Sequence, residues 1–395
     1  MQSKSKVTLL SQHVYSNIKT NTSSKSIFIL WEGALAKYEI IEEHLKKNFK
    51  IISKFELNWS KTHYHSNIAR LYNRTNKADK FTKPSKKFGN PPYKVFIVED
   101  PLPNYGWHVS TSGIPEFCNL NFIKAKKNYR KGLSHPYLVH STSTDREFTH
   151  QLTLLFGSQQ RFNDFLKSEN KPIINDLYAS NGWGSWSEFY AALEPNCEYA
   201  FLRQPKSEDM FNPEFDLDII TDDFQKFASI ANIMQRNDKP YKGSLCIENK
   251  HIKVDLRFVG DNYFPEKWQV DMLENRVLTE QNFYRLSQID QYFCLTYHGL
   301  VHKSGIDPKY HHELQQLEHE LGLPWSIKTY SKDEQLQLLN GFMLEQGYFA
   351  RVPLDADVGT DPNALRSLPK VGRTQALKLR KRIKYIRKQL LLLGY

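Results

Sequence analysis

The chain has 395 residues, of which 40% are hydrophobic, and its formal net charge is +11. This length predicts two domains, each with a packed core. Ten Lys or Arg side chains and no Asp or Glu lie in residues 366–395, so the rest of the chain is nearly neutral. That distribution excludes a basic nucleic-acid groove over the whole molecule, because binding of a phosphate backbone usually shows as a broad basic face.

The four cysteines are dispersed along the chain and form no Cys-x-x-Cys pair, which is typical of a protein in a reducing compartment. Residues 1–25 are polar and lack the apolar core of a signal peptide. No later run is long and uncharged enough to span a bilayer. We therefore expect a flexible N-terminus over residues 1–25 and a cytoplasmic protein.

Strands and helices are predicted to alternate in residues 26–160. Apolar runs predict strands, helical apolar spacing predicts helices, and enrichment in Lys, Asn and Pro predicts loops. The expected strands are 27–30, 50–57, 94–99 and 137–140, the helices 34–49, 61–72, 120–129 and 145–156, and the loops 73–92 and 100–112. Such alternation predicts an α/β layer structure in which helices pack on one sheet.

The segment around His140 resembles the phosphoacceptor site of the nucleoside diphosphate kinases. Residues 137–143 (YLVHSTS) and the helix that follows are similar to that family's strand, histidine, hydroxyl-rich turn and closing helix. Residues 28–34 are similar to its first strand and turn. The resemblance implies a ferredoxin-like domain over residues 26–160, with His140 as the nucleophile.

Three roles of His140 are compatible with this pattern. Phosphohistidine chemistry requires an imidazole held in one tautomer and cations that neutralise the phosphoryl group. Gln151 stands where the family has an acid that orients the histidine, and Tyr137 stands where it has an asparagine. His140 is therefore a candidate catalytic residue, part of a nucleotide- or phosphate-binding remnant, or a scaffold residue.

A second domain with a helical C-terminal part is predicted over residues 161–360. The expected elements are a helix at 185–193, strands at 198–203 and 215–220, a helix at 223–235, a hairpin of strands 245–247 and 251–258, and a helix at 288–303. The hairpin is expected to turn at residues 248–250. With the first domain, this order makes the whole chain α/β (α+β).

Three aspartates lie in two of these predicted strands. Asp216 and Asp218 are two residues apart, so in a strand they project from one face, roughly 6–7 Å apart. Pairing the strand of Asp255 beside the first would add a third carboxylate. Hard oxygen donors suit Mg²⁺ or Mn²⁺, and two such ions can clamp the attacking and leaving oxygens of phosphoryl transfer. The alternative is a structural or vestigial acidic cluster.

The order helix, strand, acidic strand, helix and hairpin resembles the nucleotidyltransferase fold of DNA polymerase β and the antibiotic-modifying nucleotidyltransferases. By this resemblance Asp216 and Asp218 hold both metals, while Asp255 holds the catalytic metal and helps to deprotonate the attacking hydroxyl. The family has a Gly-Ser pair shortly before its first acid. Here Gly184 and Ser185 lie about 30 residues upstream.

Arg203 and a pair of histidines are further candidates. Arg203 ends the strand before the acidic strand, where it is either a phosphate-binding residue or a solvated surface residue. His298 and His302 are four residues apart on one predicted helix, which is metal-ligand spacing. A packing or substrate-facing pair is the alternative for these histidines.

Residues 361–395 are predicted to form a basic C-terminal helix. Residues 376–393 mix Leu and Ile with seven basic side chains, which suits an anionic membrane surface, a nucleic acid or an acidic partner. A helix that docks over an apolar patch is the alternative.

These features together predict a metal-dependent nucleotidyl- or phosphoryl-transferase that acts from a nucleotide or nucleotide-activated donor on a hydroxyl acceptor. The alternative is a catalytically inactive module that binds a nucleotide or another polyanion. The candidate catalytic residues are Asp216, Asp218, Asp255 and His140, the first three being the candidate metal ligands, and Arg203 is the candidate cofactor-binding residue.

Overall fold

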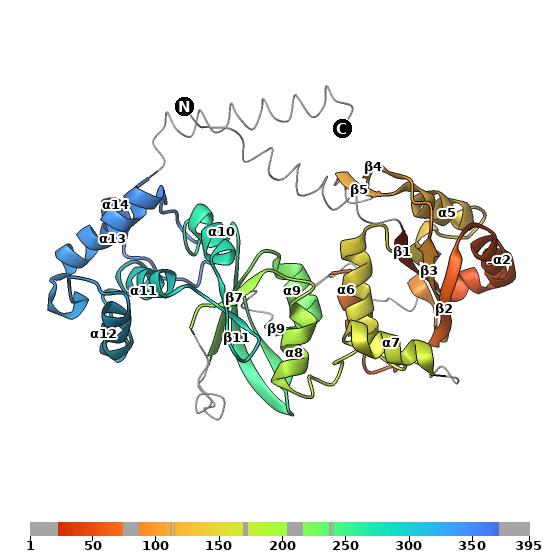
Figure 1. Ribbon diagram of the computed structural model, residues 1–395, viewed down its shortest axis with the longest axis horizontal. Coiled ribbons are helices and arrows are strands. Elements are labelled where there is room, and N and C mark those ends of the chain that lie inside the picture. The colour runs from red at the N-terminus through yellow and green to blue at the C-terminus, as the bar shows by residue number, and fades with distance from the viewer. Residues whose placement is uncertain are drawn as a thin grey trace, which may run out of the picture. The chain divides into compact units, whose positions relative to one another are not determined.

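The computed structural model describes residues 23–73, 87–110, 113, 115–168, 173–203, 216–236, 239 and 241–370. The described residues form two compact units, which divide between Ser180 and Asn181. Both units mix helices and strands, which confirms the predicted mixed α/β class (Figure 1). Most of the predicted N-terminal segment and of the basic tail lies outside the described residues. Within these ranges, every helix is too short or too polar to cross a lipid bilayer.

The first unit is built on a four-stranded antiparallel sheet with the order β2-β3-β1-β6. Its main elements are β1 (Ser24–Leu30), η1 (Glu32–Lys37), α2 (Tyr38–Asn48), β2 (Lys50–Leu57), α3 (Tyr64–Leu71), β3 (Tyr93–Asp100), α5 (Leu120–Arg130), η3 (Pro136–Leu138), β6 (Val139–Ser141), α6 (Asp145–Phe156) and α7 (Gln159–Lys167). The helix predicted at 34–49 is therefore a 3-10 turn followed by an α-helix.

Both faces of this sheet are buried: consecutive residues of a strand point to opposite faces, and residues 27–30 of β1 are all fully buried. Phe28 of β1 packs on Phe122 of α5, and Phe55 of β2 packs on Phe156 of α6. Accordingly, α2 and α5 cover one face, and α6 and α7 cover the other (Figure 1).

The first unit reaches Ser180, beyond the predicted boundary at residue 160. Helix α7 packs through Phe165 on Phe55 of the sheet. Ile174 then forms a parallel bridge with Leu57 of β2. The boundary placed at 160 was too early. The alternation of strands and helices ends at α6, but the chain continues to pack on this core as far as Ser180.

A short hairpin occupies part of the segment predicted as a loop. β4 (Tyr105–Val109) and β5 (Pro115–Asn119) pair in antiparallel register, and the ring of Tyr105 stacks on that of Phe117. The prediction of a loop over 100–112 was therefore wrong for residues 105–109, where cross-strand aromatic packing stabilises a strand.

The second unit contains a mixed seven-stranded sheet with the order β12-β13-β7-β8-β11-β10-β9. Its strands are β7 (Tyr199–Phe201), β8 (Asp216–Thr221), β9 (Met234–Gln235), β10 (Lys242–Ile247), β11 (Lys250–Phe258), β12 (Val277–Leu278) and β13 (Tyr284–Arg285). Its helices are α8 (Trp186–Leu193), α9 (Phe224–Ala231), α10 (Glu266–Glu274), α11 (Gln288–Tyr297), η5 (His298–His302), η6 (Pro308–Tyr310), α12 (His311–Glu320), η7 (Ile327–Thr329), α13 (Lys332–Gln346) and α14 (Pro362–Ser367).

The two faces of this sheet have different partners. Tyr199 of β7 packs on Phe227 of α9, whereas Ile220 of β8 belongs to the core formed with α10, α11 and the helices after them. In Figure 1, α8 and α9 lie on one side of the sheet and α10 and α11 on the other. Asp216 and Asp218 share the face of Ile220, since they are two and four residues from it. They therefore face the C-terminal helical part.

The predicted hairpin that carries Asp255 is confirmed. β10 and β11 pair in antiparallel register. They turn at Glu248 and Asn249, whose φ angles of 52° and 63° are typical of a tight hairpin turn. The helix predicted at 223–235 ends earlier, at Ala231, because Asn232 adopts a left-handed conformation with φ 55°.

Candidate active site

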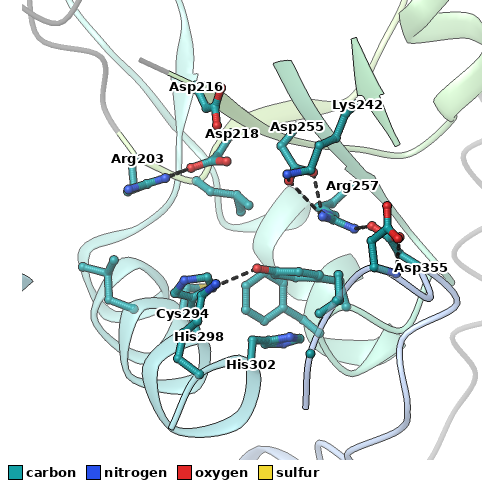
Figure 2. Close-up of a pocket in the computed structure, with 18 of the residues that line it drawn as sticks. Arg203, Asp216, Asp218, Lys242, Asp255, Arg257, Cys294, His298, His302 and Asp355 are labelled. Carbon is teal, nitrogen blue, oxygen red and sulfur yellow. Dashed lines mark hydrogen bonds and ion pairs between the residues drawn. The ribbon is translucent and has the colours of Figure 1, made fainter. Parts of the chain in front are cut away.

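β8 and β11 bring the three predicted aspartates to one face of the second sheet. The two strands are parallel, and Asp255 lies directly opposite Asp218 in their register. Asp216 lies two residues before Asp218 on the same face, while Leu217 and Ile219 are fully buried on the other face. The predicted placement of these two strands side by side is confirmed (Figure 2).

The aspartates line a cavity of about 300 Å³ in the second unit. Its wall includes six basic side chains, from Arg203, Lys239, Lys242, Arg257, Lys303 and Lys309. It also includes five acidic side chains, from Asp216, Asp218, Asp255, Asp355 and Asp357. The charges of these groups nearly cancel, so binding of divalent cations would make the cavity attractive to phosphate groups.

Arg203 binds the carboxylate of Asp218. Its Nε donates a hydrogen bond of 2.8 Å to Asp218 Oδ2, and its Nη2 donates to the same oxygen. Burial raises the pKa of Asp218, and neighbouring Asp255 and Asp216 raise it further, whereas Arg203 opposes the shift; the net effect is an increase. Arg203 therefore contacts one of the predicted site residues, while 41% of its side chain remains exposed.

Arg257 connects Asp255 to a distant part of the chain. Its side chain is only 4% exposed, and it donates hydrogen bonds of 2.9 Å to both Asp255 Oδ2 and Asp355 Oδ2. Lys242 Nζ lies 3.5 Å from Asp255 Oδ2. Asp255 Oδ1 is buried and receives no hydrogen bond, although it lies 2.8 Å from Arg257 Nη2. This oxygen is thus in ionic contact with Arg257 and shielded from solvent.

Sequence reasoning missed Arg257 and Asp355. Arg257 could have been found, because it lies two residues after Asp255 and thus on the same face of β11. Asp355 comes from an irregular segment after α13 and carries no such pattern. Its 6% exposure is low for a carboxylate, and the ion pair with Arg257 explains how the charge is accommodated.

Histidine and tyrosine side chains form the wall across from the carboxylates (Figure 2). The ring of Tyr263 stacks on His302 at 4.1 Å between centroids, and the Arg257 guanidinium lies 4.2 Å from the Tyr263 centroid. Tyr263 Oη lies 2.9 Å from His298 Nδ1. Burial lowers the pKa of His298 to about 4 and that of His302 to about 3, so both imidazoles are neutral at pH 7. His298 and His302, which were singled out by their four-residue spacing, thus both line the cavity.

His140 lies in the first unit, where side chains enclose it. It is 7% exposed, its Nε2 is 3.0 Å from Gln151 Oε1, and its ring makes an edge contact with Tyr72. Burial lowers its pKa to about 3, and the charge of Lys126 contributes. The ring is held in one position, as a phosphoacceptor requires, but it is not exposed to a substrate in this conformation.

The carboxylates are not gathered around a common point. Among the described residues, no three His, Cys, Asp or Glu side chains are grouped closely enough to hold a metal ion. Asp218 is bound to Arg203 and Asp255 to Arg257. A metal ion would therefore have to compete with these two ion pairs.

Comparisons of the chain with protein-family models, with curated proteins and with solved structures find no match.

Proposed function

We propose that the second unit is a metal-dependent nucleotidyl- or phosphoryl-transferase that acts from a nucleotide or nucleotide-activated donor on a hydroxyl acceptor. The observation that carries the proposal is the direct pairing of Asp218 with Asp255 at the wall of a cavity, with Asp216 on the same face. Like charges placed opposite each other on neighbouring strands are destabilising. Arg203 and Arg257 offset part of this repulsion, and a bound cation would offset the rest.

The donor set fits Mg²⁺ or Mn²⁺, which prefer carboxylate oxygens on rigid elements. Asp216, Asp218 and Asp255 would hold the ions, and Asp255 Oδ1 offers a buried oxygen that accepts no hydrogen bond. When bound, such ions polarise phosphoryl oxygens and neutralise charge that develops in the transition state.

The side chains of the cavity have complementary roles in this proposal. Arg203, released from Asp218, would donate its planar fork to phosphate oxygens. Lys242 and Arg257 would neutralise further phosphate charge, and Asp255 would accept the proton of the attacking hydroxyl. Tyr263 and the residues beside it would limit access of water to the phosphate.

The topology of each unit supports the family resemblances. In the first unit, the element order β1-α2-β2-β3-α5-β6 and the sheet order β2-β3-β1-β6 are those expected of a ferredoxin-like domain. In the second, helix, strand, acidic strand, helix and hairpin follow in the order that a nucleotidyltransferase-like domain requires. For His140, its enclosed position favours the scaffold role over catalysis.

The proposal is tested by measuring Mn²⁺ binding and the transfer of α-labelled and γ-labelled nucleotides with the full chain. Asp218→Asn is expected to weaken Mn²⁺ binding and to lower α-label transfer at least about 100-fold, because it removes a group that stabilises the transition state. Asp216→Asn should act in the same direction. Asp333→Asn, an exposed change in the first turn of α13, is the matched control and should alter neither property.

Two results would oppose this function. Nucleotide binding without Mn²⁺ binding or transfer would favour the inactive binding module. Equal activity of Asp218→Asn and wild type would place the chemistry elsewhere in the chain.

A further inference from the structure

The cavity contains a buried imidazole that lacks a hydrogen-bond partner. His302 is 5% exposed and lines the cavity, yet within the described part of the chain neither its Nδ1 nor its Nε2 has a partner. A buried polar group left in this state costs about 1–3 kcal/mol, so it requires an explanation. Both nitrogens are shielded from solvent in the present ring position, so one explanation is that the ring turns toward the cavity when a ligand supplies the partner.

The position of the His302 ring is fixed by its neighbours. It is stacked on Tyr263 with an interplanar angle of 14°, and Arg257 lies against the same tyrosine. His302 ends a π-helical turn, η5, that directly continues α11. Such turns are rare and occur frequently at functional sites. The ring is thus held at the cavity with its nitrogens unpaired.

The chemistry of a neutral imidazole selects the kind of ligand group that fits. A neutral imidazole has one N–H donor and one acceptor nitrogen. A hydroxyl group can satisfy either nitrogen, because it both donates and accepts. A phosphate dianion only accepts, and the cavity already offers Arg203, Lys242 and other cations for that purpose. His302 is therefore matched to a neutral, hydroxyl-bearing part of a ligand.

We propose that Tyr263 and His302 form a subsite for adjacent hydroxyl groups of a sugar or polyol, with His302 as the hydrogen-bonding residue. The subsite rests on the proposed function, since such hydroxyls belong either to the ribose of the nucleotide donor or to the acceptor. Tyr263 holds the His302 ring in place by stacking on it, and its own Oη is occupied by His298. The cost of the unpaired nitrogens is offset when the ligand binds.

The test uses His302→Phe in the full chain, because phenylalanine keeps an aromatic ring against Tyr263 and removes both nitrogens. Tyr297→Phe is the matched control: Tyr297 Oη is also buried and without a partner, but Tyr297 does not line the cavity. Both variants should unfold at the same temperature as wild type or higher, since each removes an unpaired buried polar group. Only His302→Phe should weaken ligand binding, by about tenfold.

Two binding series distinguish the sources of the hydroxyls. For the ribose, the Kd of magnesium nucleoside triphosphates is compared with that of their 2′,3′-dideoxy analogues; His302→Phe should weaken only the former. For the acceptor, binding of glycerol, sorbitol and glucose is measured in the presence of a dideoxynucleotide; His302→Phe should weaken the polyols alone. Either result supports the subsite.

The subsite is overturned if His302→Phe leaves both series unchanged, or if it weakens hydroxylated and dideoxy nucleotides equally. Its failure is distinguishable from failure of the proposed function, because Mn²⁺ binding reports on the aspartates and is expected to be unaffected by His302→Phe. A loss of thermal stability in His302→Phe but not in Tyr297→Phe would also contradict the proposal, since it would assign His302 a packing role.

Discussion

His140 in the first unit and Asp218 in the second were both predicted to be reactive residues from resemblances to enzyme families, but their surroundings differ. His140 is enclosed by Gln151, Tyr72 and the helices that cover its sheet, and does not line the cavity. Asp218 faces a cavity that contains both acidic and basic groups. The strand that carries a residue can be predicted from the sequence, whereas access to that residue depends on what the rest of the chain packs over it.

The largest effect is expected from His140→Ala. Removal of the buried imidazole should lower the free energy of unfolding of the first unit by about 3–4 kcal/mol, because a cavity remains in the core. Urea unfolding measures this change, and the labelled-nucleotide assay should show unchanged α-label transfer. The exposed His65→Ala is the control and should change stability by less than about 0.5 kcal/mol. A stable γ-label on wild type that disappears in His140→Ala would instead make the first unit catalytic.

Asp355→Asn tests whether the cavity depends on an ion pair across the second unit. Among the residues that the structure describes, the variant leaves the buried Arg257 with Asp255 as its one close carboxylate partner. We expect a loss of about 2–3 kcal/mol in unfolding free energy, less than for a buried charge left wholly unpaired. Nucleotide affinity should fall as well, and both are measured on one preparation. Stability equal to that of wild type would show that Arg257 does not need Asp355.

Acidification should weaken the first unit through His140. The pKa of this imidazole is about 3 in the folded unit, against 6.5 for an ordinary histidine. Below pH 6.5 the unfolded chain binds a proton that the folded unit does not, so stability falls as the pH decreases toward 3. At pH 5 this group should account for a loss of about 2 kcal/mol. Comparison of urea midpoints at pH 7 and pH 5 tests this, since His140→Ala should lose that part of the pH dependence.

The smallest effect is expected at the hairpin turn that precedes Asp255. Glu248 has φ 52°, a conformation that glycine adopts without steric cost. Glu248→Gly should stabilise the second unit by about 0.5–1 kcal/mol and leave Mn²⁺ binding unchanged. Thermal unfolding measures the gain. Reduced Mn²⁺ binding in this variant would mean that the position of Asp255 depends on the turn conformation as well as on strand pairing.

Much of the carboxylate cluster was predictable, because the period of a strand is short and the signal is local. Asp216 and Asp218 alternate with buried apolar residues, and Asp255 lies in a run of the same kind. Arg257 follows from the same rule. Asp355 does not, since its position depends on tertiary packing of an irregular segment rather than on a repeating pattern.

The limits of helices and loops were harder to predict. The end of α9 depends on the left-handed Asn232, and a single asparagine is a weak signal in sequence. The β4–β5 hairpin depends on aromatic contacts between its strands, such as Trp107 against Phe117. Such contacts are visible only when both strands are placed. The burial of His140 likewise depends on α6 and on the end of α3, from separate parts of the chain.

The ion pair between Arg257 and Asp355 also bears on where this protein can be divided into fragments. A fragment that ends soon after β11 would keep all three aspartates, but it would lack the histidine wall and the second anchor of Arg257. Such a fragment would contain all three aspartates but not the side chains that enclose the cavity beside them. The smallest fragment expected to reproduce the properties of this site therefore extends past Gly359, well beyond the last aspartate of the motif.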